Sequence, residues 1–76
     1  MERTKMVVNM DKGFGKLKMG SRVYFVLNAG GLWNLSYHDY SKNFLQIIFL
    51  AENKKRFSTI QKYALEQGIE LVPMEV

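Results

Sequence analysis

The chain has 76 residues, which allows a single small domain over residues 1–76 and leaves no room for a second. It contains no cysteine, so disulfide bonds and thiolate zinc sites are excluded and a reducing compartment is favoured. Hydrophobic residues make up 47% of the composition, too many for a disordered chain, and the formal net charge of +4 favours acidic partners such as nucleic acid.

The first residues and the apolar runs indicate the compartment of the protein. Residues 1–5 are charged and lead into no long apolar core, so they do not resemble a signal peptide. The longest apolar run, residues 44–51, is far too short to span a bilayer. The chain has a single histidine and scattered carboxylates, which do not favour a structural metal. We therefore expect a cytoplasmic protein with no membrane partner and no cofactor.

Short strands are predicted along the first third of the chain. Residues 4–9 form the first strand, because Val7 and Val8 favour β structure, and residues 16–19 form a brief return strand. Residues 22–27 form the clearest strand. They are apolar on both faces, which indicates a central place in the sheet.

The next two predicted strands differ in pattern. Residues 32–38 alternate, which places Trp33, Leu35 and Tyr37 on one half-buried face, with Trp33 packed under the helix. Residues 44–51 are mostly apolar, so their inward set has two alternatives. These are Leu45, Ile47 and Phe49, or the opposite set if both faces are covered.

A helix is predicted over residues 59–67. Ser58 and Gln61 match a capping box, in which each side chain satisfies a backbone amide of the other residue. Ile60 and Ala64 recur at helical spacing and form an apolar stripe that should face the sheet.

The chain closes with a helix stop and a last strand. Gly68 is placed to end the helix in a positive-φ conformation, and residues 69–72 form a strand that Pro73 marks as an edge. The elements together predict an α+β fold, a small antiparallel or mixed sheet of about five strands with one C-terminal helix. A right-handed crossover through the helix would make the last strand parallel to the fourth, the strand that precedes the helix, if both belong to one sheet.

The stretch best suited to contact a partner surrounds Phe14. Flanking glycines let the backbone approach a ligand closely, and an exposed phenylalanine offers a base a face to stack on. Lys12, Lys16 and Lys18 lie close enough in sequence to meet phosphates. The alternative is an ordinary hairpin turn with solvated lysines, in which Phe14 folds back onto the core.

Part of this stretch resembles a known family. Residues 8–15, in the order Val-Asn-Met-Asp-Lys-Gly-Phe-Gly, resemble the start of a cold-shock domain, and residues 23–25 resemble its third strand. The resemblance covers residues 5–27 and implies an OB-type β-barrel that stacks single-stranded bases on aromatic side chains. The residues that match functional positions of the family are Lys12, Phe14 and Tyr24.

A second basic cluster, Lys54, Lys55 and Arg56, precedes the predicted helix. If it lies beside the lysines around Phe14, the two clusters would form one surface that tracks phosphates. The sequence does not place the clusters relative to each other.

These patterns favour a small, basic, non-enzymatic protein that binds DNA or RNA, with a single strand as its partner. The candidate contact residues are Lys12, Phe14, Lys16, Lys18, Tyr24, Lys54, Lys55 and Arg56. One alternative is a protein–protein interaction module, such as a regulator or inhibitor of a larger protein, either monomeric or homodimeric. The other is a minimal metal-dependent nuclease, because Asp39 and the Glu52-Asn53-Lys54 run resemble the core of PD-(D/E)xK nucleases. Strand spacing places its two carboxylates too far apart to share a metal.

Overall fold

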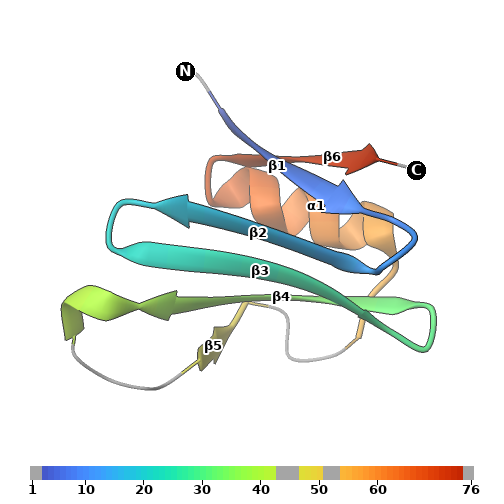
Figure 1. Cartoon of the computed structure of the whole chain (residues 1–76), viewed down its shortest axis with the longest axis horizontal. Helices are drawn as coiled ribbons and strands as arrows, with labels where there is room; N and C mark the ends of the chain where they lie inside the picture. The colour runs from blue at the N-terminus through green and yellow to red at the C-terminus, as the bar shows by residue number, and fades with distance from the viewer. Residues whose placement is uncertain (1–2, 43–46, 51–53, 75–76) are drawn as a thin grey trace.

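The computed structural model describes residues 3–42, 47–50 and 54–74, which form one six-stranded sheet with a helix on one face (Figure 1). The strands are β1 (Thr4–Asn9), β2 (Phe14–Met19), β3 (Arg22–Ala29), β4 (Leu32–Asp39), β5 (Ile47–Phe49) and β6 (Ile69–Met74). A short 3-10 helix, η1 (Tyr40–Lys42), follows β4, and the helix α1 (Phe57–Glu66) precedes β6. The α+β class is confirmed. The sheet has six strands rather than about five, and a strand follows the helix.

The strand order is β5-β4-β3-β2-β1-β6, with β1 and β6 parallel and all other neighbours antiparallel. The two strands that flank the helix, β5 and β6, run in the same direction within one sheet, as predicted for the last strand and the strand before the helix, although they lie at the two edges of the sheet. The helix carries the chain across one face of the sheet to the free edge of β1 (Figure 1). There Ile69 and Leu71 align with Thr4 and Met6, so that apolar side chains of both strands enter one core.

The core lies between α1 and one face of the sheet, which we call the covered face. Residues paired across antiparallel strands point to the same side, so the register identifies this face. Its buried members are Met6, Val8, Tyr24, Val26, Trp33, Leu35, Ile69 and Leu71, and they pack against Ile60 and Ala64 of the helix. The predicted face of Trp33, Leu35 and Tyr37 is confirmed. The Trp33 ring packs edge-on against Phe57 with the centroids 5.1 Å apart, under the helix as expected.

The helix begins two residues before the predicted start. Arg56, in extended conformation, is the N-cap residue and makes no side-chain cap, so the predicted capping box of Ser58 and Gln61 is wrong. The reason lies just upstream, where Lys55 pairs with Trp33 through two backbone hydrogen bonds of 2.6 and 3.0 Å. This bridge ends the extended segment, and the chain turns into the helix at once. Among the described residues, no helix is long and apolar enough to cross a membrane.

Two turns show how glycine shapes the fold. Gly68 has a φ of +78° and ends α1, as predicted. Gly13 has a φ of +69° and closes the β1–β2 turn, where its amide donates to the Asn9 carbonyl at 2.8 Å. A Cβ atom at Gly13 would lie 2.7 Å from the Cβ of Asn28. The tight turn lets β2 begin at Phe14, earlier than the predicted residues 16–19.

Of the strand predicted over residues 44–51, the structure describes residues 47–50, and Ile47–Phe49 form β5. Within β5, Ile48 pairs with Tyr37 and so lies on the covered face, whereas Ile47 is exposed. Ile48 therefore points inward and Ile47 does not, which agrees with the second of the two predicted alternatives. Leu45 lies outside the described residues.

The packing of α1 gives a first test of the fold. Ile60 is fully buried, so Ile60→Ala should lower the free energy of unfolding by roughly 2–5 kcal/mol, because it removes buried methyl groups and leaves a cavity. Leu65 lies on the same helix with 38% of its surface exposed, so Leu65→Ala should change the free energy of unfolding by only about 0.5 kcal/mol. Urea unfolding measures both values. Equal losses in the two variants would contradict the packing of α1 on the sheet.

Candidate nucleic-acid interface

The face of the sheet opposite α1, which we call the open face, carries most of the candidate residues. The strand register arranges its side chains in three rows that cross the sheet. The first row is Asn9, Phe14, Leu27 and Asn34; the second is Lys16, Phe25 and Ser36; the third is Lys18, Val23, His38 and Ile47.

The open face is rich in exposed apolar side chains. Eight large hydrophobic residues are exposed in the described part of the chain, and alternation along the strands places six of them on this face. These are Val7, Phe14, Leu27, Leu32, Ile47 and Met74. Exposed apolar side chains on one face are typical of surfaces that contact a partner, which makes the open face the candidate interface.

Two phenylalanine rings stand next to each other within this face. Phe14 is 41% exposed, so the alternative in which it folds back onto the core is wrong. Phe14 pairs with Leu27 and Phe25 pairs with Lys16, which makes the two rings diagonal neighbours on adjacent strands. Diagonal positions lie roughly 7–8 Å apart. The rings therefore form two neighbouring surfaces on which flat ligands can stack.

Positive charge accompanies the aromatic rings. Lys16 and Lys18 point to the open face from the same strand as Phe14, and the Lys16 Nζ atom lies 6.0 Å from the centre of the Phe25 ring. Lys5 lies on the same face of β1. Among the described strand residues of this face, Glu70 is the one carboxylate. The face is thus basic as well as apolar.

One predicted contact residue lies on the wrong side of the sheet. Tyr24 is on the covered face and is only 1% exposed, so the interpretation that it stacks on a base is wrong. Its hydroxyl accepts a hydrogen bond from Arg22 Nη1 at 3.1 Å, and its ring packs 5.4 Å from that of Tyr37. Phe25, the neighbour that the sequence analysis did not select, lies half-buried on the open face. Phe25 is identified as a member of the open face by its pairing with Lys16, and this pairing is known only from the strand register.

The remaining basic residues lie at one end of the sheet. Lys12 is exposed in the β1–β2 turn, where its backbone amide donates to Asn9 Oδ1 at 2.9 Å. The segment 54–56 lies at the same end, because Lys55 bridges to Trp33. Trp33 in turn pairs with Asn28 beside the β1–β2 turn.

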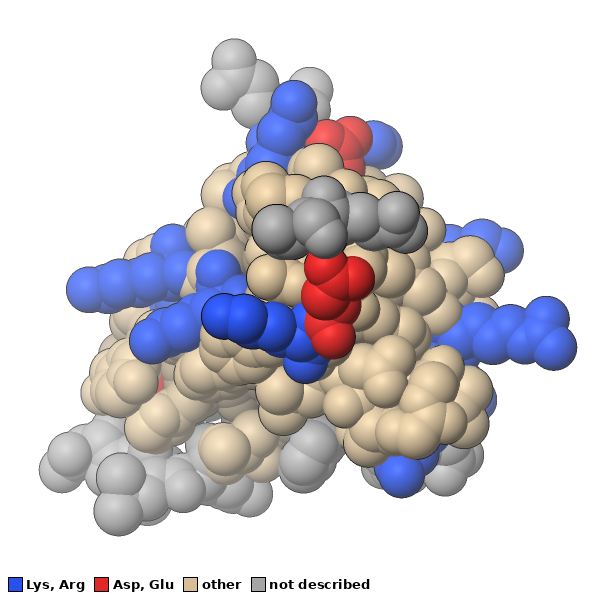
Figure 2. Space-filling model, turned by 45° about the vertical axis from the view of Figure 1, so that its right-hand side comes forward, with Lys and Arg blue, Asp and Glu red and all other residues tan. Residues whose placement is uncertain are grey.

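The two basic clusters do not merge into one patch. From β2 to the segment 54–56 there are three steps between neighbouring strands, roughly 14 Å in all. Figure 2 shows this end of the molecule with Lys and Arg side chains projecting from both of its sides, and with an acidic side chain and uncharged surface between them. The structure therefore gathers Phe14, Lys16 and Lys18 into one site and leaves Lys54, Lys55 and Arg56 at its periphery.

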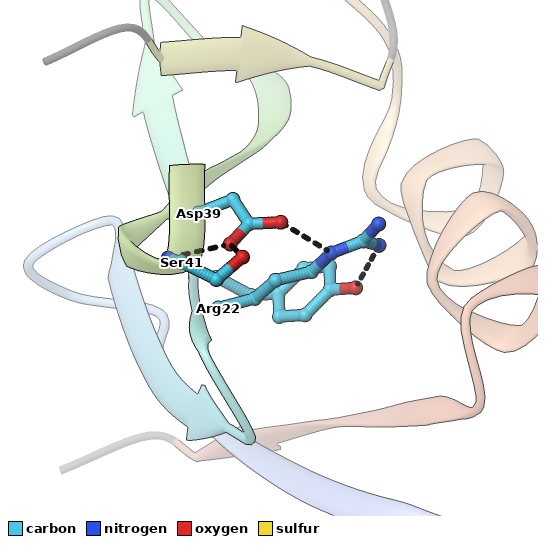
Figure 3. A network of polar contacts seen from close by, with 4 residues as sticks. Arg22, Asp39 and Ser41 are labelled. Atoms are coloured by element: carbon cyan, nitrogen blue, oxygen red, sulfur yellow. Dashed lines mark hydrogen bonds and ion pairs between the residues drawn. The ribbon is translucent and has the colours of Figure 1, made fainter. Parts of the chain in front are cut away.

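At the opposite end, a polar network holds the turn after β4 (Figure 3). The Arg22 guanidinium lies over the Tyr37 ring at 4.4 Å, and its Nε atom is 3.7 Å from Asp39 Oδ2. Asp39 Oδ1 accepts hydrogen bonds from the Ser41 hydroxyl at 2.6 Å and the Ser41 amide at 2.9 Å. These bonds, the hydroxyl first, hold the pKa of Asp39 below its ordinary value.

This network bears on the nuclease alternative. Asp39 is engaged by Arg22 and Ser41 on the covered face, and Glu52 lies outside the described residues. Within the part of the chain that the structure describes, no group of three or more His, Cys, Asp or Glu residues could hold a metal ion. No described feature brings together the residues that this alternative requires.

Comparison of the chain with models of protein families, with curated proteins and with solved structures finds no significant match. The resemblance of residues 5–27 to cold-shock domains therefore stays a prediction. That segment covers β1, β2 and most of β3, which supply the rows of the open face.

The Asp39 network predicts a pH dependence. Because the folded-state pKa of Asp39 is lower than its ordinary value of 3.8, the unfolded chain binds a proton more readily. The bonds to the charged Asp39 carboxylate contribute their full stabilisation of the folded protein above pH 3.8. This contribution is lost as the pH falls through the folded-state pKa. Ser41→Ala should raise the pKa of Asp39 towards 3.8 and lower the free energy of unfolding more at neutral pH than in acid. NMR titration of the carboxyl group and urea unfolding at both pH values measure this.

The exposed Ser58 of α1 supplies a matched control, because Ser58→Ala leaves Asp39 untouched. It should leave the Asp39 pKa where it is in the unmodified protein. If Ser41→Ala lowers stability equally at both pH values, the hydrogen bond does not act through the charge of Asp39.

Proposed function

We propose that the protein is a non-enzymatic single-stranded nucleic-acid-binding protein and that the open face is its contact surface. The observation that carries the proposal is the arrangement of Phe14 and Phe25 as diagonal neighbours with Lys16 and Lys18 beside them. Stacking of a base on an aromatic ring contributes roughly 1–3 kcal/mol, and lysine ammonium groups meet the phosphates.

The shape of the site supports a single strand over a duplex. The rings stand on strands of a sheet, and a ring can stack only on a base that has left the base stack. Phe14 and Phe25 stack on any base, which gives tolerance of sequence. Asn34, at the end of the Phe14 row, is half-buried and offers an amide to a base edge. We expect modest sequence preference.

The other candidate residues take secondary roles in this proposal. Lys12 lies at the rim of the open face, in the turn that precedes Phe14. Lys54, Lys55 and Arg56 lie at the same end, across the width of β3 and β4, and would attract a longer strand electrostatically.

The exposed apolar residues of the open face favour one second candidate, a protein-interaction module. A homodimer formed by stacking two open faces would bury Lys16 and Lys18 of both copies, and burial of unpaired charges is costly. A protein partner would therefore need an acidic face. Nucleic acid satisfies the same charges with phosphates and the same rings with bases, which makes it the better fit.

Phe14 provides the direct test of stacking. Phe14→Ala should weaken binding of a fluorescent oligothymidylate by roughly 1–3 kcal/mol, because one stacked base loses its ring. Since Phe14 is exposed, the free energy of unfolding should change little. Fluorescence anisotropy at low salt measures the affinity, and Leu65→Ala, on the helix side, is the matched control. A Phe14→Ala protein that is destabilised but binds with unchanged affinity would contradict the proposal.

Lys16 and Lys18 provide the test of phosphate binding. Replacing both with Gln should weaken binding to all single-stranded sequences alike. The slope of log K against log salt should fall by about 0.7 for each phosphate that the variant no longer neutralises. Lys62→Gln, on the exposed side of α1, should leave the slope unchanged. If the unmodified protein binds no oligonucleotide at low salt, the protein-interaction module is the better account.

A further inference from the structure

A hollow of about 480 Å³ lies on the open face at the end away from the β1–β2 turn. Its lining combines two lysines, an aromatic ring, the β2–β3 turn and one apolar side chain. The lining residues are Lys16, Lys18, Gly20, Ser21, Val23 and Tyr40. Tyr40 is 57% exposed.

The position of Tyr40 is held by several contacts. Its backbone amide donates to the Ser21 carbonyl at 2.8 Å, which folds η1 back over the β2–β3 turn. Asp39 and Ser41, on either side of it, are joined by the hydrogen bonds described above. The Tyr40 ring lies 4.3 Å from the ring of His38, a member of the third row. The exposed ring is therefore a wall fixed to the sheet.

The rest of the hollow suits an anionic, flat ligand. Val23 faces away from α1 and yet is only 4% exposed, so it forms an apolar floor beneath its neighbours. Lys16 and Lys18 stand on the side towards β2, and the lining contains no carboxylate among the described residues. A ring wall, an apolar floor and two ammonium groups match the base and the phosphate of one nucleotide.

We propose that this hollow is a nucleotide subsite, in which a base stacks on Tyr40 and its phosphate contacts Lys16 and Lys18. The inference rests on the proposed function and extends it by defining the path of the strand. Phe14 and Lys18 are four residues apart on β2, which corresponds to roughly 13 Å. The nucleic acid then runs along β2 and β3, from Phe14 past Phe25 to Tyr40.

Affinity as a function of strand length tests the subsite. Oligothymidylates with lengths from about 4 to about 16 nucleotides are titrated against the unmodified protein. The same titrations are made with Tyr40→Ala, Tyr40→Phe and Leu65→Ala. Tyr40→Ala should weaken binding of the longer strands by roughly 5- to 150-fold, the equivalent of one base that no longer stacks. Tyr40→Phe keeps a ring and should bind like the unmodified protein, as should Leu65→Ala. Urea unfolding verifies that each variant is folded.

The outcomes separate the subsite from the proposed function. If Phe14→Ala weakens binding and Tyr40→Ala does not, the subsite is overturned and the proposed function stands. An equal loss in Tyr40→Ala and Tyr40→Phe also overturns it, because the ring alone then does not carry the contact. If the unmodified protein binds no strand of any length, the proposed function itself fails.

Discussion

The pairing of β3 with β2 and β4 is the constraint on which the rest of this structure depends. It sets Tyr24 opposite Tyr37 and Val26 opposite Leu35 on the covered face, and it leaves Phe25 opposite Lys16 on the open face. Because side chains alternate along a strand, a slip of one residue would exchange the two faces of β3 completely. The core would lose its central members, and the open face would lose a ring beside its lysines.

The two faces of the sheet divide the apolar residues of this chain between the core and the proposed binding surface. One helix can cover only one face, and Ile60 and Ala64 close the core there. The chain has no disulfide, so this single core must supply the stability. The apolar residues on the other face add nothing to that core. Their place beside Lys16 and Lys18 is what makes the open face suitable for a partner that is both flat and anionic.

The network around Arg22 links the two faces at one end of the sheet. Arg22 and Asp39 lie on the covered face, where Arg22 packs over Tyr37. Asp39 binds Ser41 and so fixes the turn that carries Tyr40 to the other side. Contacts that belong to the fold thereby hold a ring at the edge of the proposed binding surface.

Local pattern alone determined the features that depend on neighbours in sequence. Alternation placed Trp33 on the covered face, helical spacing placed Ile60 in the core, and the glycine at position 68 ended the helix. Only the tertiary structure decided between Tyr24 and Phe25, because a strand that is apolar on both sides does not reveal its inner face until its partners set the register. The start of α1 and the place of β6 likewise depend on contacts between distant segments, a backbone bridge and a shared core, which no local pattern encodes.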